Sequence, residues 1–162
     1  MLVVVADTSP IRYLAQIDQI DLLPRLFGKI FVPSVVADEL RHPSAPQAVQ
    51  AWMKEMPGWV EVSPDIDAAD PVLRRLDPGE RSAIMLGLSL KADLILIDDR
   101  KGAAAALQKG LESTGTLGVL DRAAQRGLID LADALARLKQ TNFRYRQEMM
   151  DALLDRSKGK TR

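Results

Sequence analysis

The chain has 162 residues, of which 47% are hydrophobic and 27% are charged, an ordinary composition for one globular domain with its own core. It has no cysteine, which excludes disulfide bonds, cysteine-ligated zinc and a thiol nucleophile. The 22 basic and 22 acidic side chains balance, so the chain lacks the positive excess that marks many nucleic-acid binders.

The chain begins with an apolar run. Residues 2–6 (LVVVA) are continuously hydrophobic, which predicts a strand covered on both faces. A helix over 9–17 follows, with Ser9 as its expected N-cap and a proline in its first turn. A short helix over 21–27 ends at a glycine, and a second strand is expected over 29–33.

The middle of the chain repeats this alternation of strands and helices. Two helices are expected over 33–41 and 46–56, and the alternating pattern of WVEV predicts a third strand over 59–62. A loop rich in Asp and Pro separates this strand from a strong helix over 77–91. The run ADLILID predicts a fourth strand over 92–98.

The last part of the chain is mainly helical. A helix is expected over 100–110, and a short fifth strand over 111–114 leads into a helix over 116–127. Two amphipathic segments, 130–139 and 145–155, complete the set of predicted elements.

Strands that alternate with helices predict an α/β fold, with a parallel sheet covered by helices on both faces. We expect a single domain over residues 1–155 and a basic, flexible tail over 156–162. No apolar run is long enough to cross a bilayer and the first is too short for a signal peptide, so we expect a cytoplasmic protein without membrane contact. Ligands of such sheets bind at the carboxyl ends of the strands.

Acidic residues occupy these strand ends. Asp7 follows the first strand, and Asp98 and Asp99 follow the fourth, so these acids meet if the two strands are neighbours. Glu39 lies in the helix after the second strand, one turn beyond its apolar residues, and Glu80 lies in the first turn of the helix before the fourth strand. No Ser/His/Asp set and no phosphate-binding glycine loop competes with them.

Clustered carboxylates raise each other's pKa and cannot all ionise without a counter-charge. A divalent cation supplies that charge, and oxygen ligands without Cys or a well-placed His favour Mg²⁺ or Mn²⁺ over zinc. Such an ion can hold a phosphate and activate a water, so the expected chemistry is phosphodiester hydrolysis.

Each acid also has a structural interpretation. Asp77 and Glu80 form a capping box, in which Asp77 is the N-cap and Glu80 the third helical residue. Asp7 could begin a turn, Glu39 could lie on a helix surface, and one of the two acids at 98–99 could cap the helix that follows. The spacing alone leaves these interpretations open.

The segments that carry these acids resemble the successive motifs of PIN-domain proteins, in particular the DUF3368 branch, which is related to VapC-type toxin ribonucleases. The resemblance extends over nearly the whole chain and rests on ADTSPIRYLAQI, IFVPSVVADEL, DPGERSAIMLGLSLKADLILIDDRKG, TGTLGVLDRAAQRGLI and TNFRYRQEMMDALL. It implies a three-layer α/β/α sandwich with a mostly parallel central sheet of about five strands. It also implies an acidic metal site that cuts single-stranded nucleic acid, chiefly RNA.

By position, the resemblance assigns catalysis and metal binding to five acids, of which only one of the last two is expected to face the site: Asp7, Glu39, Glu80, Asp98 and Asp99. It places three hydroxyl residues beside them: Thr8, Ser9 and Thr116. Thr116 stands in a Thr-Gly-Thr segment that replaces the family's later threonine–aspartate arrangement. We interpret Thr116 as the N-cap of a helix that begins at Leu117. The alternative is that its hydroxyl supports the metal site.

Arg81 and Arg100, each adjacent to a proposed ligand, are candidates for phosphate contacts or equally for solvated surface residues. The function expected from the resemblance is a metal-dependent endoribonuclease, the toxin of a toxin–antitoxin pair, with RNA as substrate, an antitoxin as partner and a homodimer as its assembly. The alternative is a non-catalytic PIN-fold module that binds protein or RNA, which the zero net charge keeps open. A phosphotransfer receiver domain is disfavoured, because the end of the fifth strand carries Thr114-Gly115-Thr116 where such a domain needs a lysine.

Overall fold

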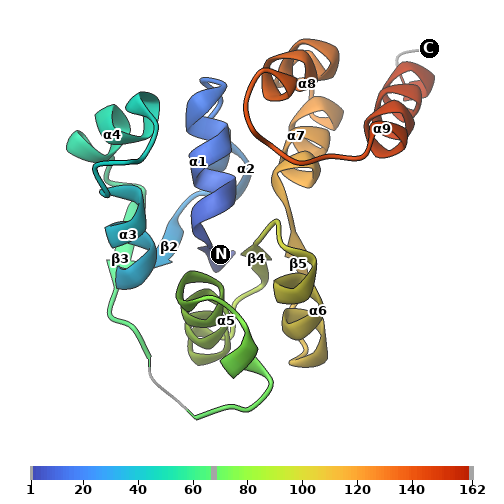
Figure 1. Cartoon of the computed structure of the whole chain (residues 1–162). Coiled ribbons are helices and arrows are strands. Elements are labelled where there is room, and N and C mark those ends of the chain that lie inside the picture. The colour runs from blue at the N-terminus through green and yellow to red at the C-terminus, as the bar shows by residue number, and fades with distance from the viewer. Residues whose placement is uncertain (1, 67–68, 161–162) are drawn as a thin grey trace.

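The protein is built around a sheet whose strands all run parallel. The structure, a computed structural model, describes residues 2–66 and 69–160 (Figure 1). Within these residues the strand order is β3-β2-β1-β4-β5. The strands are β1 (Val4–Ala6), β2 (Ile30–Pro33), β3 (Val60–Ser63), β4 (Leu94–Leu96) and β5 (Ser113–Thr114). The predicted α/β fold is confirmed, and β1 and β4 are neighbours.

β1 lies at the centre of the sheet, and its residues are fully buried. Val4 pairs with Ile30 of β2 on one side and with Leu94 of β4 on the other. Val4 and Ala6 belong to the apolar core on one face of the sheet, whereas Val5 belongs to the core on the other face. A strand covered on both faces must be apolar throughout, which accounts for Val4–Ala6. The strand is shorter than the predicted 2–6, and Leu2 is exposed.

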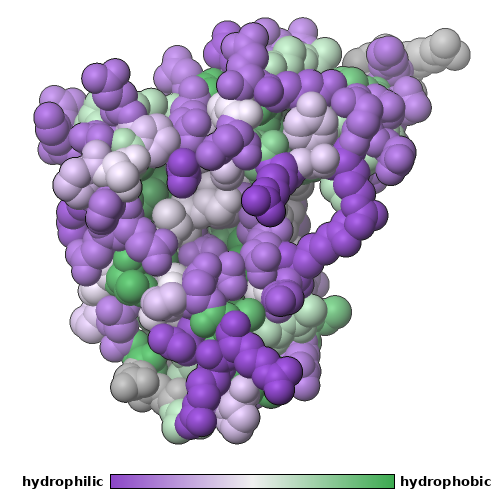
Figure 2. All heavy atoms as spheres, in the orientation of Figure 1, coloured by the Kyte–Doolittle hydropathy of each residue, from purple (hydrophilic) through white to green (hydrophobic). Residues whose placement is uncertain are grey.

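Helices form the two outer layers, with α1, α2 and α7 on one side of the sheet in Figure 1 and α5 and α6 on the other. The helices are α1 (Thr8–Gln16), α2 (Leu22–Phe27), α3 (Ser34–Leu40), α4 (Gln47–Lys54), α5 (Pro78–Leu90), α6 (Arg100–Gln108), α7 (Thr116–Gln125), α8 (Leu131–Lys139) and α9 (Gln147–Lys160). All were expected from the sequence, but a short 3₁₀ helix, η1 (Leu73–Arg75), was not. In the same orientation, the face shown in Figure 2 is covered largely by hydrophilic side chains.

The start of α1 differs from the prediction. The helix begins at Thr8, and Asp7, in an extended conformation, occupies the N-cap position. The backbone N–H of Asp7 donates to the carbonyl of Leu96 at 2.9 Å, which fixes this residue to the end of β4. The predicted N-cap role of Ser9 is therefore wrong: its hydroxyl donates to Asp98 instead.

The C-terminal segment continues as a helix beyond the expected domain boundary. α9 runs through Lys160, so the described part of the basic segment 156–162 is helical, and residues 161–162 lie outside the described part. Met150 and Leu153 of α9 are buried in the core, and Arg156 lies 3.8 Å from Asp121 of α7. The flexibility of this tail stays a prediction. Within the described residues, no helix is both long and apolar enough to span a membrane.

Candidate functional site

Acidic side chains from four parts of the chain meet at the carboxyl edge of the sheet. Asp7 lies at the end of β1, next to the end of β4 with Asp98 and Asp99. α3, which carries Glu39, and the first turn of α5, which carries Glu80, pack beside them. The strand order thus places the predicted site residues at one edge, as the rule for open parallel sheets requires.

Asp7 and Glu39 converge on the first turn of α5 at Gly79. The position that a Cβ atom would take on Gly79 lies 3.0 Å from Asp7 Oδ1 and 3.0 Å from Glu39 Oε1. Because Gly79 has no side chain, both carboxylates can approach its backbone closely, where a Cβ atom would be crowded. Thr8 orients Glu39 in this contact, because its hydroxyl donates to Glu39 Oε2 at 2.5 Å.

The site holds two carboxylic acids whose pKa values are far from ordinary. Burial raises the pKa of Asp7 from 3.8 to about 7, and the charges of Asp77, Glu39 and Asp98 add to the shift. Burial also raises the pKa of Glu80, from 4.5 to about 8, with further contributions from Asp77 and other acids around it. A positive ion among these groups would relieve both effects.

Glu80 reaches the first turn of α6 and still lies within range of the charge of Asp7. Its backbone N–H donates to Asp77 Oδ1 at 2.9 Å, which confirms Asp77 as the N-cap of α5. Its carboxyl carbon lies 3.7 Å from the position of a Cβ on Gly102, in the first turn of α6. Sequence reasoning gave Asp77 a capping role only, yet its charge raises the pKa of both Asp7 and Glu80.

Asp98 is held by three hydrogen bonds. Its Oδ2 accepts from the Ser9 hydroxyl at 2.7 Å and from the Thr116 hydroxyl at 2.8 Å, and its Oδ1 accepts from the Thr116 backbone N–H at 2.6 Å. Thr116 is fully buried and is the first residue of α7, with Gly115 at the N-cap position. The expectation that Thr116 caps a helix from Leu117 is thus wrong, because Asp98 binds the N-terminus of α7 from the neighbouring strand.

Asp99 points to the other side of the strand end and caps α6. Its Oδ2 accepts from the backbone N–H of Gly102 at 3.1 Å. The charge of Asp98 acts on Asp7, whereas the charge of Asp99 acts on Glu80. The two adjacent acids therefore serve opposite halves of the acidic edge.

Comparison with known protein families decides what kind of domain this is. A family model, DUF3368, described as a PIN domain, matches residues 3–159. The chain is a PIN-domain protein. No curated protein and no solved structure matches it. PIN domains are in general nucleases that use divalent metal ions, which places this protein among the hydrolases.

The donors of this PIN domain fit a hard divalent cation by their chemistry. Among the described residues, no three acidic or histidine side chains stand close enough to hold one ion together. Mg²⁺, however, keeps several of its waters and binds through one or two carboxylates. Asp7 and Glu39, whose carboxylates converge on Gly79, supply such a pair, whereas Asp98 is already bound by Ser9 and Thr116.

The two arginines predicted to contact phosphate both border the acidic edge. Arg81 is half-buried in the first turns of α5, and Arg100 is the exposed first residue of α6. Neither forms an ion pair or hydrogen bond with any other side chain in the described part of the chain. Their side chains are available for an external anion, and their role in substrate binding stays a prediction.

The raised pKa of Asp7 predicts a pH-dependent effect of Asp7→Asn on stability. Without metal, folded Asp7 keeps its proton up to about pH 7 whereas unfolded Asp7 loses it near 3.8, so the stability of the wild type falls as pH rises between these values. In EDTA, Asp7→Asn should match the wild type near pH 4 and exceed its unfolding free energy by about 2–4 kcal/mol at pH 8. Urea unfolding at both pH values measures this, and an equal difference at both would contradict the assignment.

Substitution of Gly79 tests whether Asp7 and Glu39 bind the metal ion together. Gly79→Ala places a methyl group against Asp7 and Glu39, so Mg²⁺ affinity, measured by calorimetry, should fall at least about tenfold. Gly58→Ala is the matched control, because a Cβ at Gly58 meets nothing within 4 Å. Equal Mg²⁺ affinity in the two variants would place the ion elsewhere.

The Thr116 hydroxyl is predicted to stabilise the fold through Asp98. Thr116→Val keeps the shape but leaves Asp98 Oδ2 with one fewer donor, and should cost about 1–3 kcal/mol of unfolding free energy. Thr116→Ser retains the hydroxyl and should cost clearly less. Chemical denaturation of the two variants measures the difference, and equal losses would assign the effect to packing of the methyl group.

Proposed function

We propose that this PIN-domain protein is a metal-dependent endoribonuclease that hydrolyses phosphodiester bonds in single-stranded RNA, with Mg²⁺ or Mn²⁺ bound by Asp7 and Glu39. The observation that carries this proposal is the convergence of Asp7 Oδ1 and Glu39 Oε1 on Gly79, each 3.0 Å from the position that a Cβ atom would take there. Membership of a family of nucleases supports the reaction class.

The chain's own residues have distinct parts in this reaction. The ion, when bound, polarises the phosphodiester and makes a water more acidic. Asp7 gives up its proton to bind the ion, which its raised pKa places near neutral pH. Thr8 fixes the carboxylate of Glu39 through its Oε2, and both oxygens of Glu39 lie close to Gly79. Arg81 is placed to hold the substrate phosphates at the rim.

Glu80, Asp98 and Asp99 contribute charge and position in this proposal. Asp98 holds the N-termini of α1 and α7 and thereby sets the orientation of Asp7. Glu80 and Asp99 extend the negative edge toward α6, where Arg100 offers a second contact for phosphate.

We propose further that the protein acts in the cytoplasm as the toxin of a toxin–antitoxin pair, held inactive by a protein antitoxin, and that it forms a homodimer. The resemblance of its motifs to VapC-type ribonucleases supports this role. Tyr145 and Met149, which are 40% and 49% exposed on the C-terminal segment, offer apolar surface for a partner.

A second candidate function is a non-catalytic PIN-fold interaction module. It is favoured by the hydrogen bonds that already occupy Asp98 and Asp99, and by the lack, among the described residues, of three acids that could share one ion. This module would bind RNA or protein independently of Asp7 and of any metal.

Cleavage of a mixed pool of structured and single-stranded RNA separates these functions. Purified protein should cut single-stranded segments with Mg²⁺ or Mn²⁺ and not in EDTA, and Asp7→Asn should reduce the rate by about 100-fold or more. Asp38→Asn is the matched control, because Asp38 is an exposed acid on α3 next to Glu39.

Metal-dependent cutting that Asp7→Asn abolishes and Asp38→Asn preserves would support the nuclease. A pool that both wild type and Asp7→Asn bind equally but leave intact, with the fold of each verified by circular dichroism, would favour the interaction module instead.

A further inference from the structure

One face of α1 carries polar groups that have no partner. Among the described residues, the buried side-chain nitrogen and oxygen atoms without a hydrogen bond are Arg12 Nε and Gln16 Nε2. The two residues are four positions apart on α1, so they lie on one face of the helix, one above the other. Thr8, one turn before Arg12 on the same face, already contacts Glu39 of the acidic site. The face thus begins at the proposed metal site and continues along α1.

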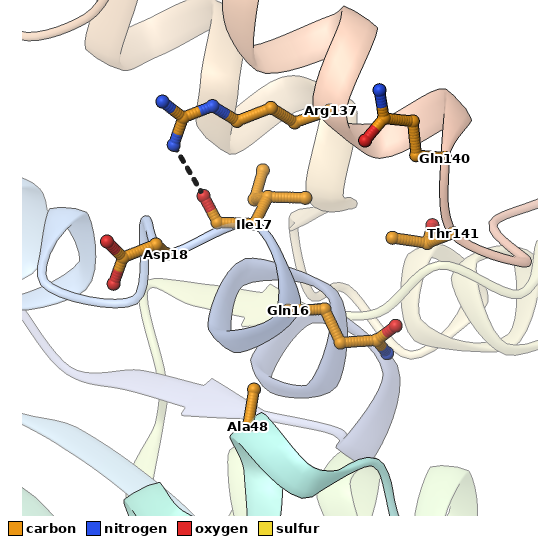
Figure 3. Close-up of a pocket in the computed structure, with 7 residues that line it drawn as sticks. All are labelled: Gln16, Ile17, Asp18, Ala48, Arg137, Gln140 and Thr141. Carbon is orange, nitrogen blue, oxygen red and sulfur yellow. Dashed lines mark hydrogen bonds between the residues drawn. The ribbon is translucent and has the colours of Figure 1, made fainter.

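A cavity of about 490 Å³ lies at the far end of this face. Figure 3 shows Gln16 of α1 between Ala48 of α4 on one side and Gln140 and Thr141, at the end of α8, on the other. Its volume is in the range of pockets that hold small organic groups. Gln16 therefore lines a cavity large enough for a ligand, and its amide nitrogen is buried next to it without a partner.

The segment after α8 is fastened to α1 and forms one wall of this cavity. The ring of Phe143 packs edge-on against Tyr13 with the centroids 5.0 Å apart, and the Tyr13 hydroxyl donates to Asn142 Oδ1 at 2.9 Å. The guanidinium of Arg137 is held in place by Asp133 at 3.2 Å and by the Ile17 carbonyl at 3.4 Å (Figure 3). These contacts keep the wall fixed relative to Gln16.

The charges along this face suit a phosphate near Arg12 and a neutral polar group in the cavity. Arg12 forms no ion pair or hydrogen bond within the described chain; its guanidinium lies 5.8 Å from the ring centroid of Tyr13. The cavity is lined by one acid and one base: Asp18, whose carboxylate accepts hydrogen bonds from amino groups, and Arg137, whose charge is paired with Asp133. The amides of Gln16 and Gln140 offer both donors and acceptors, as the edge of a nucleobase requires.

We propose that this face of α1 binds one nucleotide of the single-stranded RNA substrate next to the cleavage site, with its phosphate on Arg12 and its base in the cavity at Gln16 and Gln140. This inference rests on the proposed nuclease function. Residues on one helix face recur about every 5.4 Å, close to the spacing of phosphates in an extended single strand, so a strand that leaves the acidic site reaches Arg12 and then the cavity.

Equilibrium binding of fluorescein-labelled, random-sequence RNA of three and twelve nucleotides tests this proposal. Binding is measured by fluorescence anisotropy with the full chain in Ca²⁺, which takes the same kind of oxygen ligands as Mg²⁺, over a series of salt concentrations. Arg12→Ala should weaken 12-mer binding at least about fivefold and reduce the magnitude of the slope of log affinity against log salt by about 0.7, the value for one phosphate contact on a single strand.

The matched control is Arg25→Ala, which removes an exposed arginine of α2 and should leave affinity and salt slope unchanged. Arg12→Lys should retain the salt slope. Gln16→Ala should alter the preference among homopolymeric 12-mers without changing the slope, because an amide carries no charge. The advantage of the 12-mer over the 3-mer should disappear in the Arg12→Ala, Gln16→Ala double variant.

The outcomes separate this inference from the function on which it rests. If the wild type binds the 12-mer and cleaves RNA while the variants Arg12→Ala and Gln16→Ala bind as tightly and with the same salt slope, the nucleotide site on α1 is wrong and the nuclease stands. If the wild type neither binds nor cleaves any strand, the proposed function fails together with the inference.

Discussion

The carboxylate of Asp98 joins the ends of three elements. It follows β4, accepts a hydrogen bond from Ser9 in α1, and accepts two from Thr116 at the start of α7. Because Asp7 immediately precedes α1, the direction of its side chain depends on this junction. The orientation of the α1 face that carries Arg12 also depends on the bond between Ser9 and Asp98. The position of α7, which contacts α8 and α9, depends on the bonds between Thr116 and Asp98. One acid thus connects β4 to the first turns of α1 and α7 at this edge.

The acidic edge is kept at the expense of stability. A buried Asp7 and a half-buried Glu80 both hold their protons to near-neutral pH, which means that their charged forms are poorly solvated in the fold. Proteins that lack a use for such groups replace them with apolar or hydrogen-bonded residues. This unfavourable burial of acids lies at the carboxyl edge, whereas β1 behind it is entirely apolar and fully buried. A site for a cation is the simplest physical reason for that arrangement.

The order and type of the elements could be predicted from the sequence, because strands buried on both faces and amphipathic helices have strong local patterns. From the sequence, Asp7 was expected to meet Asp98 only if β1 and β4 were neighbours. The sheet order confirms that these two strands are neighbours. The N-cap roles predicted for Ser9 and Thr116 were wrong, because the N-caps are Asp7 and Gly115. Capping rules consider only residues near a helix start, whereas both hydroxyls donate to Asp98 from distant parts of the chain. No local pattern carries that information.

The side-chain directions within the site were also beyond the sequence. The sequence grouped Glu80 with Asp7 and Glu39 but did not show that its carboxyl group also lies against the first turn of α6. Gly79 has no side chain to suggest a function, and its importance follows only from the two carboxylates that approach it. The short helix η1 was missed because its three residues show no periodicity.

The residues that bind Asp98 lie far from one another in the sequence, and this affects when the site can form during translation. Ser9 and Asp98 are separated by 89 positions, and Thr116 follows Asp98 by another 18. A growing chain that emerges from the ribosome can pair β1 with β2 early, yet it cannot place β4 or the start of α7 until the chain has been translated through Thr116. The acidic edge therefore cannot form before that point, and whatever chemistry it performs begins only after it.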